Sequence, residues 1–313
     1  MPRSYFPVLR GKQYELLALR DLAETIKVEK KIRPVIEPLS VQATASALDR
    51  FTETSMPFCL IVNPKIGALS SLGLKAFYQQ LVQPYLEQDD LFLPTLYIDG
   101  QTTSSDLAEF IAIYQGQRAF FLTDEPRTAV THAVQAASPS LVLLAHGTVA
   151  KPTKDLFAAD VSVDITDPFR RRSRNKDYAA TPDEFFSDQH LRTPNADFGH
   201  FGDYSIIGER YSIEGGPAYC VAIHMIYAQP PPEQILRVRH FLSDSNETPA
   251  DPGGKFSQAV AKLAADWPQL ADVNHTAAAT RFLEMNVQQL YPGLGKVKEL
   301  SLKHHFELMH KLL

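Results

Sequence analysis

Cysteine is nearly absent from this sequence, and so is any long apolar run. The two cysteines, Cys59 and Cys220, lie in separate apolar stretches and do not form a closely spaced metal-binding pair. They are expected to be buried thiols in a reducing compartment. No run of about 18 apolar residues is present for a membrane span, and residues 1–12 are too polar and too short for a signal peptide. These features predict a cytoplasmic protein.

Basic residues are also fewer than acidic residues. The chain carries 31 Lys and Arg residues against 36 Asp and Glu residues, for a net charge of -5. A nucleic-acid coat protein needs a broad basic surface, so the composition excludes that class for the whole chain, although local basic patches remain compatible with it. The sequence also lacks a P-loop, HExxH or CxxC motif, and it shows no assignable Ser/His/Asp or Cys/His arrangement.

What the chain does contain is an alternation of strands and helices. Short, almost continuously apolar strands are predicted at residues 5–9, 33–37, 58–63, 91–99, 118–124 and 141–145. Helical spacing of apolar residues falls between them, at 13–27, 43–52, 70–87, 103–114 and 127–137. Such strands, separated by helices, are typical of parallel strands buried on both faces, which indicates the α/β class.

Two more strands bring the count to eight. A strand at 161–165, a helix at 181–191 and a strand at 204–207 complete a pattern that favours a closed (β/α)8 TIM-like barrel. The alternative is an open doubly wound α/β sheet. Only one glycine follows the first strand, at Gly11, so the dinucleotide fingerprint of the open sheet is missing. This absence favours the barrel.

The pattern changes near residue 215, where we place the end of the barrel-like part, 1–215. Residues 216–313 are expected to form an antiparallel pair, 218–228 and 235–242, followed by helices at 256–267, 276–290 and 296–313. We expect this segment to pack on the barrel as one continuous domain. Three histidines of the last helix, His304, His305 and His310, are interpreted as solvated, with metal binding as the alternative.

Polar side chains follow nearly every predicted strand. In a barrel these strand ends build the face that carries active sites. Glu37, His146, Asp164 and Asp203 are predicted as catalytic acids, bases or metal ligands. An imidazole titrates near neutral pH and serves as a general acid or base, although a lone histidine here also fits a structural role. The ligand-binding candidates on this rim are Arg10, Lys12, Asn63, Lys65, Tyr204 and Arg210.

Acidic residues at the same strand ends suggest a hard cation. Asp99 and Asp124, together with Glu37 and Asp164, have the oxygen ligands that Mg²⁺ takes. No spacing motif supports this site. Each acid fits equally well into a structural ion pair with Arg10, Lys12 or Lys65.

A basic loop follows the strand at 161–165, after Asp164 and Asp167. Its cations are Arg170, Arg171, Arg172, Arg174 and Lys176. Guanidinium groups match phosphate oxygens in pairs, and barrels often hold phosphate beside their last two strands. The loop therefore predicts a phosphate-bearing partner: a phosphorylated small molecule, a nucleotide or a nucleic-acid end. A mobile charged loop is the alternative.

Four stretches of the chain form a recognisable set: YFPVLRGKQYELLAL at 5–19, RPVIEPL at 33–39, FGDYSIIGERYSIEGGPAYCVAIHMIY at 201–227 and RVRHFLSD at 237–244. They resemble an uncharacterised beta-protein family found in phages and in bacterial mobile or defence islands. The resemblance implies a mobile-element setting with a predicted nuclease encoded nearby. It implies no catalytic residue, but the block at 201–227 draws attention to Asp203, Tyr204, Glu209 and Arg210.

Two functions are compatible with these features. The first is a phosphate-ligand-binding barrel protein that acts as a phosphoester hydrolase on a nucleotide or nucleic acid. The second is a non-catalytic interaction or regulatory partner of a nuclease, with the segment after residue 215 as its docking surface.

Overall fold

The computed structural model describes residues 3–27, 31–85, 91–192, 198–212, 216 and 218–313. The chain divides into two compact units. The barrel unit comprises Met1–Asp167 and Arg192–Tyr204, and the C-terminal unit comprises Pro168–Leu191 and Ser205–Leu313. The division therefore differs from the predicted boundary at 215, because 168–191 and 205–215 group with the C-terminal residues. None of the described helices is both long and apolar enough to cross a membrane.

Eight parallel strands form the barrel unit, and each pairs with the next along the chain. The first and last strands are joined by a parallel bridge between Tyr5 and Phe201, where the Phe6 amide donates to the Phe201 carbonyl at 2.9 Å. The predicted (β/α)8 class is confirmed, and the open sheet is excluded by this closure. The strands are β1 Val8–Leu9, β2 Val35–Ile36, β3 Phe58–Ile61, β4 Phe92–Ile98, β5 Ala119–Leu122, β6 Leu141–Ala145, β7 Ser162–Thr166 and β9 His200–Asp203.

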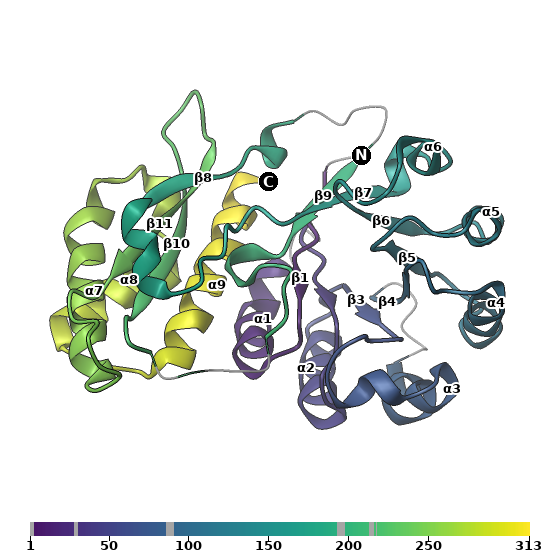
Figure 1. The fold of residues 1–313 in the computed structure, drawn as a ribbon, viewed down its shortest axis with the longest axis horizontal. Coiled ribbons are helices and arrows are strands. Elements are labelled where there is room, and N and C mark those ends of the chain that lie inside the picture. The colour runs from purple at the N-terminus through teal and green to yellow at the C-terminus, as the bar shows by residue number, and fades with distance from the viewer. Residues whose placement is uncertain (1–2, 28–30, 86–90, 193–197, 213–215, 217) are drawn as a thin grey trace. The chain divides into compact units, whose positions relative to one another are not determined.

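Helices follow most of these strands and lie outside them, as Figure 1 shows for α2 to α6. Phe110 of α4 contacts Phe120 of β5, with 5.5 Å between the ring centroids, so one face of β5 packs on this helix. The helices are α1 Gln13–Ile26, α2 Val41–Glu53, α3 Leu74–Phe77, α4 Ser104–Ile113, α5 Thr128–Ala136 and α6 Lys151–Lys154.

The continuous helix predicted at 70–87 is wrong within the described residues. A 3-10 helix, Ala68–Ser71, comes first, then α3, a π-helical turn Tyr78–Val82 and a 3-10 turn Gln83–Tyr85. Gly73 is extended, with φ -70° and ψ 158°, and Pro84 has no amide to donate. Glu87 lies outside the described residues.

Barrel closure depends on a close approach at Gly202. A Cβ atom there would lie 2.1 Å from the Phe6 carbonyl oxygen and 2.6 Å from Ile165 Cδ1. The closing strand is thus a glycine-containing segment, β9, and not the apolar residues predicted at 204–207. Ser205–Ile207 instead forms a 3-10 helix.

The C-terminal unit is an antiparallel sheet in the order β10, β11, β8. The predicted antiparallel pair is confirmed as β10 Ala222–Ala228 and β11 Leu236–Leu242. The helix predicted at 181–191 is wrong, because β8 Asp183–Ser187 pairs with β11. Glu184 and Phe186 of β8 are buried and Phe185 is exposed, which is strand alternation.

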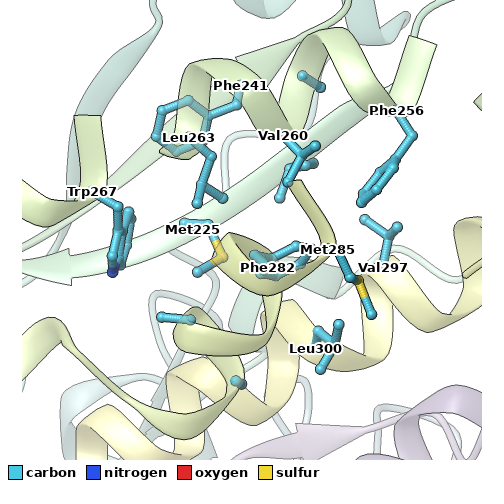
Figure 2. Packing of buried hydrophobic residues seen from close by; sticks show 14 of the residues in the cluster. Met225, Phe241, Phe256, Val260, Leu263, Trp267, Phe282, Met285, Val297 and Leu300 are labelled. Atoms are coloured by element: carbon cyan, nitrogen blue, oxygen red, sulfur yellow. The ribbon is translucent and has the colours of Figure 1, made fainter. Parts of the chain in front are cut away.

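Three helices pack in this unit: α7 Pro252–Asp266, α8 Ala277–Gln288 and α9 Leu294–Leu312. Their apolar residues meet one face of the sheet in a buried core that Figure 2 shows. Met225 and Phe241 reach this core from the strands, and Phe256, Trp267 and Phe282 reach it from the helical segment.

The last helix is buried on more than one side. It packs against α8, β10 and the 3-10 segments Ser205–Ile207 and Asp272–Asn274. His304 and His305 are therefore fully buried, whereas His310 is partly exposed. The prediction of solvated positions for the first two histidines was wrong.

Candidate functional site

The strand-end residues of the barrel unit divide between two faces, because side chains alternate along a strand. Phe120 contacts α4, so its side chain lies on the helix side of the sheet, and it is in register with Val142, which is in register with Ser162. Asp164 lies two residues after Ser162 on the same strand and therefore shares this helix-side face. Tyr97 and Phe121 are in register on the opposite face, with ring centroids 5.0 Å apart. The inward face therefore carries a different set of polar groups from Asp164.

The inward set centres on Arg10 and Glu37, which form an ion pair. Arg10 Nη1 donates to the Tyr97 hydroxyl at 3.2 Å, and its guanidinium lies 5.1 Å from the Tyr204 ring centroid. Glu37 is 1% exposed, and its Oε1 accepts the Lys65 amide at 2.8 Å. Four strand ends thus meet at one buried carboxylate.

Electrostatics in this cluster favour a charged Arg10 guanidinium and a neutral Tyr97 phenol. Burial alone would lower the pKa of Arg10, but Tyr97 and Glu37 raise it overall. Burial, followed by the charge of Glu37, raises the pKa of Tyr97 well above its usual value. Arg10 therefore stays ionised beside Glu37.

Two further predicted residues, Asn63 and Lys65, bind neighbouring groups on the rim. Asn63 Oδ1 accepts the Tyr97 amide at 2.7 Å, and its Nδ2 donates to the Tyr97 carbonyl at 2.9 Å. Lys65 Nζ lies 2.9 Å from Asp99 Oδ2. Although partial burial opposes it, this lysine lowers the pKa of Asp99. The cations Arg10 and Lys65 each hold a carboxylate, so the alternative of structural ion pairs describes this rim.

The other predicted rim residues have further partners. Asp124 is exposed and accepts the amide of Glu125 at 2.8 Å. The Lys12 carbonyl accepts the amides of Glu15 and Leu16 in the first turn of α1. Asp203 accepts the Tyr5 hydroxyl at 2.7 Å, and burial together with Asp203 raises the pKa of Tyr5. Within the described ranges, no three or more His, Cys, Asp or Glu side chains gather to hold a metal ion.

His146 and Asp164 form a dyad at the ends of β6 and β7. His146 Nδ1 lies 3.0 Å from Asp164 Oδ1, the histidine side chain is 58% exposed and the aspartate side chain 9% exposed. A carboxylate that accepts the Nδ1 proton fixes the tautomer and leaves Nε2 as the basic nitrogen. This pair has the geometry of a general base with its orienting acid.

The first half of the basic loop is held by protein groups of the C-terminal unit. Arg172 Nη2 donates to Glu184 and to Thr181, each at 3.0 Å, and Arg170 lies 3.9 Å from Glu184. Arg171 donates to the carbonyl of Arg210 at 3.0 Å. The three predicted phosphate-binding arginines thus have structural partners, and Arg210 contributes its backbone.

The second half of the loop borders a cavity of about 530 Å³. Residues 173–176 line it together with Tyr219, Cys220 and Asn246, and we call it the Lys176 cavity. Tyr219 is 52% exposed. Within the part of the chain that the structure describes, the Lys176 ammonium group makes no hydrogen bond or ion pair, although its charge acts on the neighbouring Asp177 carboxylate. The cation run pointed to this loop, but no local signal marked Tyr219 or Asn246.

Comparison with known proteins adds only distant likeness. No protein-family model matches the sequence, and no curated protein matches it. Among solved structures, the chain is similar to tryptophan synthase from M. tuberculosis in an aminoacrylate- and BRD0059-bound form, with TM-score 0.39, 13% identity, and coverage of 66% of this chain and 84% of that one. An open form with BRD0059 bound gives TM-score 0.38, 13% identity, and coverage of 66% and 85%. Likeness at this level carries no functional argument, so the barrel assignment rests on the strand pairing itself.

Proposed function

We propose that this protein binds a phosphate-bearing ligand of the nucleotide class in the Lys176 cavity. The observation that carries the proposal is the ammonium group of Lys176 on a cavity wall that Tyr219 shares. Among the described residues it forms no hydrogen bond or ion pair, and the carboxylate that its charge acts on, Asp177, is already paired with Arg174. An ammonium group binds phosphate as a point charge. An exposed aromatic ring stacks a base, and the cavity volume suits a small molecule.

The loop is anchored in place before any ligand arrives. Asn175 Nδ2 donates to the Cys220 carbonyl at 2.8 Å, which ties the loop to the residue just before β10. Arg174 Nη2 lies 2.9 Å from Asp177 Oδ1, so its charge is already paired. Lys176 is left as the cation that an incoming phosphate neutralises, and little loop ordering is needed on binding.

The proposal predicts that Lys176→Ala weakens binding of adenosine monophosphate at least tenfold, because a hydrogen bond to a charged group contributes about 1.5–3 kcal/mol. Isothermal titration calorimetry on the full chain measures this change. Arg170→Ala is the matched control: Arg170 belongs to the same loop, is 65% exposed and does not border the cavity. Equal affinity in wild type and Lys176→Ala, or no binding by wild type, would overturn the proposal.

A second candidate is phosphoester hydrolysis in the barrel unit, and the His146–Asp164 dyad favours it. General acid–base catalysis contributes about 10²–10⁴ in rate, so His146→Gln should lower kcat on bis(p-nitrophenyl) phosphate by that factor and leave KM nearly unchanged. Asp164→Asn should lower kcat as well, because an amide does not stabilise the imidazolium.

Release of p-nitrophenol, followed with and without Mg²⁺, measures the hydrolysis. His132→Gln is the control, because His132 is an exposed histidine on α5 of the same unit. If wild-type protein binds adenosine monophosphate and releases no p-nitrophenol, the hydrolase function is excluded. That result would favour a role as the non-catalytic partner of a nuclease.

A further inference from the structure

We propose that the ligand is a dinucleotide whose single bridging phosphodiester lies against Lys176, with one nucleoside on each side. This inference rests on the proposed function and deepens it. A second cavity of about 410 Å³ adjoins the Lys176 cavity, and the two share Lys176, Cys220 and Asn246 as lining residues. Lys176 therefore stands where the two cavities meet, within reach of a ligand that extends through both.

The charge on the walls fits one phosphate group with one negative charge. In the second cavity, Lys262 Nζ lies 2.7 Å from Asp244 Oδ1 and donates to the Leu242 carbonyl at 2.8 Å. Arg174 of the first cavity is paired with Asp177. Among the described residues that line either cavity, Lys176 is thus the charged side chain that forms no ion pair; the carboxylate that its charge acts on, Asp177, is already paired with Arg174. A phosphodiester carries one charge, which this ammonium neutralises.

Each cavity also offers surface for a nucleoside. The first has the half-exposed ring of Tyr219. The second is lined by Ala179, Pro182 and Phe241, together with His240. His240 is held from behind, since its Nε2 lies 3.3 Å from Glu184. Both volumes fall in the range of about 300–1,000 Å³ that small-molecule sites occupy, so each holds one nucleoside.

The test compares adenosine monophosphate with adenylyl-adenosine, the dinucleotide that has one phosphodiester, by calorimetry on the full chain. Wild type should bind the dinucleotide at least tenfold more tightly. Ala179→Phe fills the second cavity and should remove this advantage while leaving the affinity for adenosine monophosphate unchanged. Ala180→Phe is the matched control, since Ala180 is exposed, adjoins Ala179 in the 3-10 helix Asn175–Ala180 and lines neither cavity.

The outcomes separate the two proposals. Equal affinity for both ligands in wild type, or an advantage that survives Ala179→Phe, would overturn the dinucleotide and leave the nucleotide site standing. Binding of neither ligand would overturn both. Thermal unfolding of each variant confirms that a lost affinity is not a lost fold.

Discussion

Lowering the pH from 7 to 5 is expected to reduce the unfolding free energy of the C-terminal unit by about 5 kcal/mol. The cause is three desolvated imidazoles: those of His304 and His305, which are fully buried, and that of His224, which is partly buried. Burial also lowers the pKa of the neighbouring His240, which acts in the same direction. Burial, with the neighbouring His240, lowers the pKa of His224 to about 3. Burial, with the neighbouring His304, lowers the pKa of His305 to about 3. Burial lowers the pKa of His304 to about 4, despite its acceptor at the Ile226 carbonyl.

The sign follows from which state binds the protons. Histidine in an unfolded chain titrates near pH 6.5, so below that pH the unfolded chain binds protons that the folded unit does not bind. The unfolding free energy is therefore not reduced by these three side chains above pH 6.5, and it falls as the pH drops toward 4. Each contributes about 1.4 kcal/mol per pH unit in that window.

Urea denaturation of the full chain at pH 7, 6 and 5 measures this dependence. His305→Gln should flatten the slope by up to about one third, because one of the proton-binding differences is gone. His132→Gln, which changes an exposed histidine of the barrel unit, should leave the slope unchanged. A C-terminal transition with the same free energy at pH 7 and pH 5 would contradict the burial of these imidazoles.

Arg10→Met is expected to destabilise the barrel unit by about 3–5 kcal/mol. The substitution leaves the Glu37 carboxylate, which is 1% exposed, buried without its cation. Adding Glu37→Gln should restore about 2 kcal/mol of this loss, because an amide oxygen still accepts the Lys65 amide and no buried charge remains.

Lys65→Met provides the contrast. Its partner Asp99 is 28% exposed and the lysine side chain is 50% exposed, so loss of this pair should cost about 1 kcal/mol or less. Chemical denaturation of Arg10→Met, Lys65→Met and the Arg10→Met/Glu37→Gln double variant measures these changes. If Arg10→Met were no more costly than Lys65→Met, the inward cluster would not stabilise the barrel.

Strand prediction succeeded where burial on both faces produces a continuous apolar run in the sequence. Residues 141–145 form β6 as predicted, and β3, β4 and β5 lie within their predicted ranges. It failed at β9, because closure there depends on how near Gly202 comes to Phe6, a contact between residues 196 positions apart. It also failed at β8, whose partner β11 lies about 50 residues further along the chain.

The candidate site was predicted in part, for a similar reason. Arg10, Glu37, Asn63, Lys65 and Asp99 do come together at one end of the barrel. Reading the strand ends as one ring missed the alternation of faces, which turns Asp164 away from them. The basic loop was recognised as unusual, but its sequence does not show which of its cations find protein partners.

By itself, the sequence determined the α/β class, the order of parallel strands and the polar character of their ends, because these follow from local periodicity and from where apolar runs stop. Only the tertiary structure decided which rim cations pair, that His304 and His305 are buried, and that Lys176 borders two cavities. Those outcomes depend on contacts between residues far apart in the chain, such as Ser205 with His305 and Asn175 with Cys220. No local pattern encodes such contacts.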